Sequence, residues 1–363
     1  MVGVQWCHGL FDRPFHPPAP ILGLVRQRDL RTHMSRLDMD AYRAHTDRPA
    51  SETSHPIIVI GAGLAGAVAA RLLADHGFDV VVLDKGRRVG GRCSRRALDD
   101  VVVTHGARHV HDWPEWMKAW CDGENTVMVQ DGSTPSLRLM DGPETIAGWL
   151  NGIDVVTGTT VVRIEQSDDQ WHVHDEEGNR WEATGVVVTA PLPQLHRMMP
   201  GAPESWSNHA YRPTWSLVLA HGTPPPAAFR PTLENLGFEV EESDGTTGAV
   251  VHFPHDWSQS HLEDERTDVV QAFMDMTSGV DNEVLDWLKS ATCQSHRWRY
   301  GRADALGVES AFPRLVEAGD AWETPVGTGG AALRSGAWAA AHMAWQCSQH
   351  LRPASAPVQQ TLF

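Results

Sequence analysis

The sequence predicts an α/β fold, in which a Rossmann-like domain is followed by a segment that mixes strands and helices. Three observations carry this prediction. Residues 57–84 read as a strand, a glycine-rich turn, a helix and a second strand, which is the opening unit of a doubly wound parallel sheet. Residues 153–190 hold three further strand-like runs. Residues 205–305 then place strand-like and helix-like runs in an order typical of α+β proteins.

The first strand, 56–60, is short, apolar and β-branched, as strands buried in parallel sheets are. Gly61, Gly63 and Gly66 then form the pattern G-x-G-x-x-G. In this pattern the first glycine allows a tight turn, the second lets a pyrophosphate approach the backbone, and the third lets the helix pack close to the sheet. A helix is predicted over 64–76, and its N-terminus would point free N–H groups at the phosphates.

An acidic residue, Asp84, ends the second predicted strand, 79–83. A carboxylate at this position suits the hydroxyl groups of a ribose. Three glycines in six residues are weak evidence by themselves, and the alternative is an ordinary βαβ unit without a ligand. Here the strand, helix, second strand and acid all follow in order, which favours a dinucleotide.

A second glycine turn, 86–92, follows at once and is rich in arginine. Five arginines stand in ten residues of a chain whose net charge is -16: Arg87, Arg88, Arg92, Arg95 and Arg96. Arginine binds phosphate oxygens bidentately, so a pyrophosphate between the two turns would compensate the cluster. NAD-dependent dehydrogenases need no such element, and the turn therefore favours FAD. For Arg95 and Arg96 the alternative is a solvated loop paired with surface carboxylates.

The stretches VLDKGRRVGGRCSRR (82–96) and VTHGARHV (103–110) resemble the flavin-binding amino terminus of the renalase-like proteins, within the amine oxidase flavoprotein superfamily. Later stretches agree with this resemblance: TAPLPQL (189–195), HRWRY (296–300), EAGDAW (317–322) and GGAALRSGAWAA (329–340). The resemblance covers about residues 55–350. It implies a discontinuous, GR2-type Rossmann-like FAD-binding domain with an inserted α+β substrate domain, and FAD as the cofactor.

The resemblance also implies the site residues. Asp320 would bond the ribityl or phosphate region, residues 333–336 would lie near the isoalloxazine ring, and the backbone near Val162 would bind adenine. The full set of expected cofactor-binding residues is Gly61, Ala62, Gly63, Leu64, Ala65, Gly66, Asp84, Lys85, Arg88, Gly91, Arg92, Val162, Gly319, Asp320, Leu333 and Ser335.

The rest of the chain gives weaker predictions. Residues 113–121 look helical, 143–150 look like a short helix, and 176–178 look like the turn of a hairpin. In the inserted segment we expect strands at 212–222 and 248–257 and helices at 264–277 and 282–290. The expected organisation is a disordered extension (1–54), the N-terminal segment of the FAD-binding domain (55–112), a connecting segment (113–140), a β-meander and return strand (141–204), the substrate domain (205–305), the C-terminal segment of the FAD-binding domain (306–350) and a flexible tail (351–363).

Composition limits the classes of partner. The chain carries 46 acidic against 30 basic residues and has a pI near 5.6, which disfavours a nucleic-acid-binding surface. No apolar run is long enough for a membrane span. The N-terminus lacks the apolar core of an export signal, and the five cysteines are scattered without a C-x-x-C. We therefore expect a cytoplasmic protein with free thiols.

A histidine-rich stretch follows the second turn. His105, His109 and His111 with Asp112 have a spacing that could hold a metal, but the stretch aligns with a family segment that binds none, so we expect no metal. His105 and His109 are instead weak candidates for residues that face the flavin or the substrate; the alternative is a structural role in hydrogen bonding.

These observations predict an FAD-dependent oxidoreductase that takes a hydride from a small-molecule substrate, either an amine or a dihydronicotinamide, and passes electrons to dioxygen or another acceptor. Two alternatives are open. One is a catalytically idle flavin-fold protein recruited through its last five residues, 359–363, which resemble the Q-x-x-L-F peptide that docks on the bacterial sliding clamp. The other is a desaturase or porphyrinogen-type oxidase with an apolar, membrane-facing patch.

Overall fold

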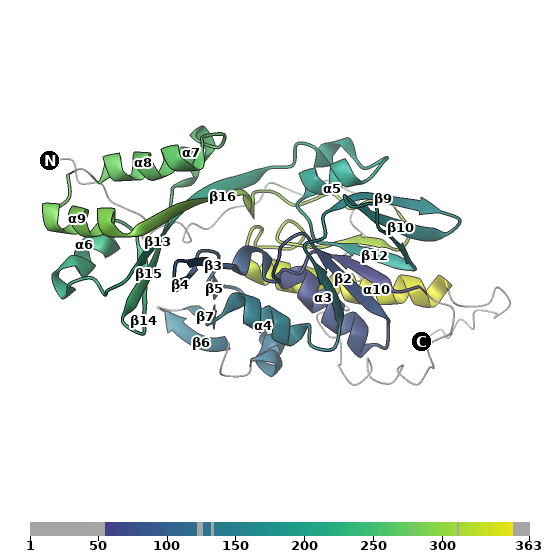
Figure 1. Cartoon of the computed structure of the whole chain (residues 1–363). Helices are drawn as coiled ribbons and strands as arrows, with labels where there is room; N and C mark the ends of the chain where they lie inside the picture. Colours follow the sequence, from purple (N-terminus) through teal and green to yellow (C-terminus); the bar gives the residue numbers. More distant parts are fainter. Residues whose placement is uncertain (1–54, 122–125, 132–133, 278, 311, 351–363) are drawn as a thin grey trace, which may run out of the picture.

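The computed structural model describes residues 55–121, 126–131, 134–277, 279–310 and 312–350. The predicted extension, 1–54, and the predicted tail with its clamp-binding peptide lie outside these residues. Two lobes are visible in Figure 1, and the long strands β13 (Tyr211–His221) and β16 (Thr292–Ala303) reach from the second lobe towards the first.

The first lobe is built on a five-stranded sheet in the order β17-β12-β1-β2-β8, and every neighbouring pair in it is parallel. Its strands are β17 (Leu315–Glu317), β12 (Gly185–Val188), β1 (Ile57–Ile60), β2 (Val80–Asp84) and β8 (Asp154–Thr157). The strands β1 and β12 are fully buried. The sheet joins chain segments more than 230 residues apart, which confirms the predicted α/β class with a discontinuous Rossmann-like sheet.

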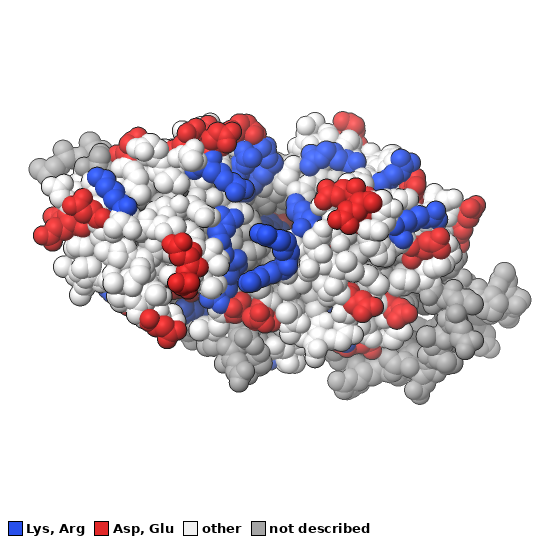
Figure 2. Space-filling model, viewed as in Figure 1, with Lys and Arg blue, Asp and Glu red and all other residues white. Residues whose placement is uncertain are grey.

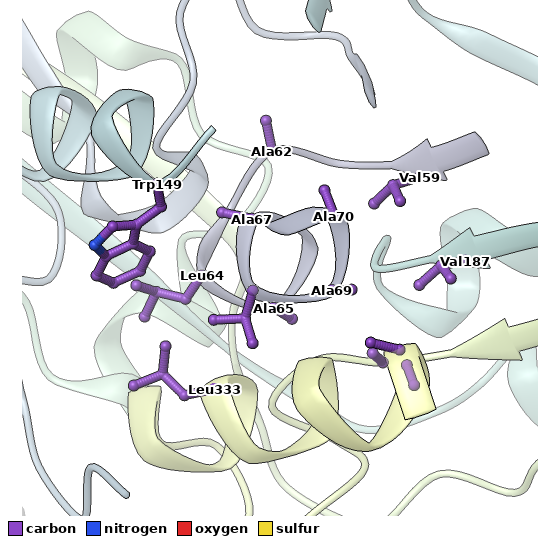
Figure 3. Packing of buried hydrophobic residues seen from close by; sticks show 14 of the residues in the cluster. Val59, Ala62, Leu64, Ala65, Ala67, Ala69, Ala70, Trp149, Val187 and Leu333 are labelled. Atoms are coloured by element: carbon purple, nitrogen blue, oxygen red, sulfur yellow. The ribbon is translucent and has the colours of Figure 1, made fainter. Parts of the chain in front are cut away.

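Two helices cover one face of this sheet. They are α3 (Leu64–Asp75), which matches the predicted helix, and α10 (Gly329–His350). Their apolar side chains form one core with alternate residues of β1 and β2 (Figure 3). The helices approach closely at Gly336, where a Cβ atom would lie 2.3 Å from the carbonyl oxygen of Ala65. This contact fixes the start of α10 beside the start of α3.

A three-stranded antiparallel meander covers the other face: β9 (Val161–Ser167), β10 (Gln170–Asp175) and β11 (Arg180–Ala183). Its buried side chains, Ile164, Trp171 and Val173, pack with the second set of β1 and β12 residues and with α5 (Leu192–Met198). The predicted hairpin at 176–178 is confirmed, because β10 and β11 pair in antiparallel register across it.

The segment after the second glycine turn is richer in strands than the sequence indicated. It contains η1 (Gly91–Cys93), the hairpin β3 (Arg95–Leu98) and β4 (Val101–Thr104), and a small sheet of β5 (His109–Val110), β6 (Thr126–Asp131) and β7 (Thr134–Leu139). The helix predicted at 113–121 is a 3-10 helix, η2 (Glu115–Trp120). The predicted short helix is confirmed as α4 (Gly142–Trp149), capped by Asp141.

The second lobe is a four-stranded antiparallel sheet in the order β14-β15-β13-β16, which includes β14 (Glu239–Ser243) and β15 (Thr246–His252). Four helices lie in the same segment: α6 (Arg230–Asn235), α7 (His255–Ser260), α8 (Arg266–Met276) and α9 (Asn282–Ser290). The expected strand 212–222 and the helices expected at 264–277 and 282–290 are confirmed. The strand expected at 248–257 ends at His252, and its last three residues instead begin α7 after Pro254. The short turns η3 (Glu204–Trp206) and η4 (Ala227–Phe229) complete the connections.

The two faces of this second sheet contact different parts of the protein. Trp215, Leu217 and Leu219 of β13 alternate onto the face that packs under the helices. Val218 and Ala220 point the other way, towards Leu98 and Val103 of the β3–β4 hairpin. The first lobe therefore touches the sheet through the face opposite to the helices.

Candidate functional site

The first glycine turn has the backbone that only glycine supplies. Gly61 has a φ of +104°, and a Cβ there would lie 2.3 Å from the hydroxyl oxygen of Thr189. A Cβ at Gly66 would lie 1.8 Å from the carbonyl oxygen of Gly61. Gly63 is different, because the nearest atom to its Cβ position is 3.9 Å away. The protein's own packing would therefore allow a side chain at this position. Its absence leaves room for a phosphate to approach the backbone.

The helix α3 begins on this turn without a capping side chain. Its N-cap is Gly63, no side-chain oxygen accepts from its first N–H groups, and its first turn holds no acidic residue. The first N–H groups of a helix have no partner inside the helix, and the positive end of the helix dipole lies there. The start of α3 is therefore suited to an anion.

The second glycine turn lies directly against the first. The N–H of Gly90 donates to the carbonyl oxygen of Ala62 at 2.9 Å. Gly91, with a φ of +54°, comes so close that its Cβ position is 3.1 Å from the Cα of Gly63. Gly63 is half-buried and Gly91 is exposed. The two turns thus bring bare backbone together at one site, here called the crevice.

Asp84 ties the two turns together. One carboxylate oxygen accepts from the N–H of Ala62 at 2.5 Å, and the other accepts from the N–H of Gly86 at 2.6 Å. A carboxylate has about four acceptor positions, so Asp84 keeps capacity for the ribose hydroxyls expected of it.

The adenine end of the expected site lies beside Asp84. The N–H groups of Gly158 and Thr159 donate to the carbonyl oxygens of Gly86 and Asp84, so β9 begins next to the crevice. Val162 on β9 is 45% exposed. The exposed Lys85 lies nearby and donates to Gln194 at 3.3 Å.

Arg92 and Asp320 contact each other, whereas the sequence suggested that each binds the cofactor. Two guanidinium nitrogens of Arg92 donate to the two carboxylate oxygens of Asp320, both at 2.7 Å. Asp320 also accepts from the N–H of Ala303 at 2.8 Å, and Arg92 donates to the carbonyl of Gly301 at 3.1 Å. Burial alone would raise the pKa of Asp320, but the charge and hydrogen bonds of Arg92 hold it below its ordinary value.

The other arginines of the cluster divide into two kinds. Arg95 forms an ion pair with Asp141, the capping residue of α4, so the alternative of a carboxylate partner holds for it. Arg87 and Arg88 are exposed within the second turn, and no ion pair of theirs is found among the residues that the structure describes. Arg88 is therefore free to meet a phosphate.

Ser335 and Leu333, both expected near the flavin, have side chains committed to the protein. Ser335 is 2% exposed, and its hydroxyl group contacts both the N–H and the carbonyl of Gly319, at 2.9 and 2.8 Å. Leu333 is fully buried in the core with α3. The N-terminal backbone of α10 is therefore the part of this helix that could contact the cofactor, and the side chains of Ser335 and Leu333 hold the helix in place.

Sequence reasoning missed Thr189. Its hydroxyl group donates to the carbonyl of Ile60 at 2.9 Å and contacts the carbonyl of Gly61 at 3.3 Å, so it fixes the exit of β1 into the glycine turn. The sequence signal that could have identified Thr189 is its position directly after the buried run 185–188, which forms the strand next to β1. Only the strand order shows that this end meets the glycine turn.

The two candidate histidines lie in different surroundings. His105 is 3% exposed, and burial, with the nearby His296 and Arg96, lowers its pKa to about 3. Its ring packs against His296 and Trp298, with centroids 4.7 and 5.3 Å away. His109 instead contacts the hydroxyl group of Ser136 at 3.2 Å. No group of three His, Cys, Asp or Glu side chains that could hold a metal is found among the described residues of the chain.

Comparisons with known proteins agree with this geometry for the first lobe. The family model described as an NAD(P)-binding Rossmann-like domain matches residues 59–122. A zeta-carotene-forming phytoene desaturase of Myxococcus xanthus is 48% identical over 50 residues, which are 14% of this chain and 10% of the desaturase. An L-amino-acid oxidase of Notechis scutatus scutatus is 38% identical over 69 residues, which are 18% and 13% of the two chains. The chain thus matches about a tenth of the length of these curated relatives.

The likeness in fold extends much further than the likeness in sequence. A double mutant of putrescine oxidase with redesigned cofactor binding superposes with a TM-score of 0.58 at 12% identity, covering 80% of this chain and 99% of the oxidase. The fold of this chain is therefore that of putrescine oxidase, including the second lobe.

None of the helices in the described residues is long and apolar enough to cross a membrane.

Proposed function

We propose that this chain is an FAD-dependent oxidoreductase of the renalase-like group, with the FAD pyrophosphate in the crevice between the two glycine turns. The contact of Gly63 with Gly91 at the uncapped start of α3 carries this proposal. It leaves bare backbone where a phosphate needs to approach, and Arg88, two residues before Gly90, is exposed. The matched relatives include oxidases, desaturases and a flavin-containing monooxygenase, which supports FAD over NAD.

The protein residues have separate tasks in this proposal. Asp84 holds the two turns together and offers its remaining acceptor positions to the ribose. The pair Arg92–Asp320 joins the second turn to the C-terminal segment, and Ser335 fixes Gly319 at the start of that segment. When bound, FAD would supply hydride acceptance and electron transfer. The second lobe would then cover the flavin with the sheet face opposite to its helices.

The substrate is a small molecule in this proposal, with dioxygen or another acceptor taking the electrons. A desaturase acting on an apolar substrate at a membrane is less well supported. Among the described residues of the second lobe, Met276 is the large apolar side chain that is strongly exposed, and it stands alone. An apolar docking patch would need several such side chains together.

A single substitution tests the cofactor crevice. In Gly63→Ala the added methyl group meets nothing within the protein closer than 3.9 Å, so the chain should fold, but the methyl group occupies the space of a phosphate. We expect FAD content per protein, measured by absorbance and by release on denaturation, to fall at least about tenfold, the equivalent of about 1.4 kcal/mol. The control is Gly148→Ala on α4, where a Cβ meets nothing within 4 Å. Wild-type protein without FAD, or a Gly63→Ala variant with full FAD, would refute the proposal.

A further inference from the structure

A polar cluster lies where the second sheet faces the first lobe. On β16, Arg297 stacks on Trp215 on the helix side, with 5.6 Å to the ring centroid. His296 and Trp298, its neighbours in sequence, point to the opposite side, where they pack against His105. The rings of His296 and Trp298 are 4.2 Å apart. Three aromatic rings from two lobes thus meet in one place.

Arg96 brings a positive charge to this cluster. Its guanidinium group donates to the Nδ1 atom of His296 at 2.9 Å and to the side-chain oxygen of Gln294 at 3.3 Å. Both partners are uncharged, and no carboxylate among the described residues forms an ion pair with Arg96. Burial, and then the charge of Arg266, lower its pKa. A half-buried cation without a counter-charge is costly unless a ligand supplies one.

Two carboxylates of β14 lie against Arg108. Glu241 on β14 lies 3.0 Å from Arg108, and Glu239 lies 3.9 Å from it. Arg108 is 8% exposed and needs both of them. Both carboxylates of β14 therefore lie against Arg108, and neither forms an ion pair with Arg96.

The histidines of the cluster add neutral donors. Burial, with Arg96 and Arg266, lowers the pKa of His296 to about 4, so its ring is neutral at pH 7. Because its Nδ1 accepts from Arg96, its proton is on Nε2. Trp298 donates to the hydroxyl of Ser216 at 3.1 Å, and that hydroxyl contacts Nδ1 of His252 at 2.8 Å. These contacts connect Trp298 through Ser216 to His252 on the neighbouring strand.

The wider surface has the same sign. Figure 2 shows lysine and arginine side chains gathered around a hollow between the two lobes. This occurs in a chain whose net charge is -16. A cleft lined by one sign of charge attracts ligands of the other sign.

We propose that Arg96, with His296 and Trp298, binds an anionic group of the substrate, a carboxylate or a phosphate, and that the enzyme selects anionic substrates over amines that carry positive charge alone. That this anion belongs to a substrate rests on the proposed function. The planar fork of arginine matches both kinds of anion, and the ring cluster offers a planar apolar surface beside it.

Two pairs of ligands test the charge requirement by calorimetry on the full-length protein as purified. Nicotinamide mononucleotide and nicotinamide riboside differ only in a phosphate. The second pair, 4-aminobutanoate and 1,4-diaminobutane, has chains of four carbons and exchanges the carboxylate for a protonated aminomethyl group. We expect the anionic member of at least one pair to bind about 10- to 100-fold more tightly, the range of a charge-assisted hydrogen bond, and the pair that responds identifies the anion. Equal binding within both pairs, or tighter binding of the diamine with no preference for phosphate, overturns the proposal.

Variants assign the effect to Arg96. Arg96→Gln should abolish the difference within the responding pair, and Arg96→Lys, which keeps the charge but loses the fork, should reduce it. Arg299→Gln is the matched control, because it removes the same charge from the other face of β16, where Arg299 pairs with Glu263. If Arg96→Gln and Arg299→Gln weaken binding equally, the proposal fails. Calorimetry does not need the flavin, so protein without FAD would refute the proposed function while leaving this result readable.

Discussion

Arg92 and Arg96 stand four residues apart after the same glycine turn, yet their surroundings are opposite. Arg92 makes a bidentate pair with Asp320, 228 residues away in sequence. Arg96 reaches across to the second lobe and meets only neutral partners. The first arrangement joins two distant segments of the protein. The second leaves a charge that the protein itself does not neutralise.

This difference separates scaffold from recognition. A charge that the protein compensates fully adds to the rigidity of the crevice, since both oxygens of Asp320 and two nitrogens of Arg92 are fixed. A half-buried charge without a counter-charge is unfavourable in the free protein, and a bound anion would compensate it. The two arginines therefore make opposite predictions about what a substitution changes: stability for the first, ligand binding for the second.

Removing Asp320 should have the largest effect. Asp320→Ala leaves the guanidinium of Arg92 and the N–H of Ala303 without their acceptor in a buried place. Breaking one side of a buried ion pair costs about 3–5 kcal/mol, and we expect about 3 kcal/mol, because the side chain of Arg92 is 37% exposed. The measurement is the free energy of unfolding in urea at pH 7.

The double variant Arg92→Met with Asp320→Ala is the control for this prediction. Removing both charges should recover some of the loss, because the uncompensated guanidinium is gone. If the double variant is less stable than the sum of the two single variants predicts, the pair is not what holds this corner together.

The buried Glu317 in the first lobe allows a second test of how the protein treats a buried charge. Glu317 is 3% exposed on β17, and burial raises its pKa from 4.5 to about 7, against the opposing hydrogen bond from Ser310. The folded protein therefore binds a proton more tightly than the unfolded chain. The stability from this group is present below pH 4.5 and is lost as the pH rises through 7.

Glu317→Gln should remove this dependence on pH. The variant and the wild type should be about equally stable at pH 4.5, and at pH 8 the variant should be more stable by about 2–3 kcal/mol, since one pKa unit is worth about 1.4 kcal/mol. Urea unfolding of both proteins across this range checks it. A difference that does not change with pH would show that Glu317 is ionised normally in the folded protein.

The glycine turns could be predicted from the sequence because their signal is local. Gly61, Gly63 and Gly66 lie within six residues, and the structure shows a steric or backbone reason for glycine at Gly61 and Gly66. The strand β13 and the helices α8 and α9 of the second lobe were also predicted, since their periodicity is local. The hairpins β3–β4 and β6–β7 were not, because charged residues and short runs hide their alternation.

The side-chain partners could not be predicted in the same way. Nothing near Arg92 in the sequence indicates that Asp320 meets it. The arginine-rich turn assigned Arg92 to the cofactor, and the family resemblance assigned Asp320 to it. Arg95 and Arg96 look equivalent in sequence, but they lie on opposite faces of β3. One meets Asp141 and the other meets β16. Such differences depend on which distant strand packs on which face, and a single sequence does not carry that information.

Arg96→Gln should have the smallest effect on stability. Among the described residues Arg96 pairs with no carboxylate, so its replacement leaves no carboxylate unpaired. The substitution also removes a half-buried charge beside Arg266. We expect the free energy of unfolding in urea to change by less than about 1 kcal/mol, in either direction. A loss above about 2 kcal/mol would mean that Arg96 is a structural residue like Arg92. The contrast between the two arginines would then vanish, and with it the reason to assign Arg96 to a ligand.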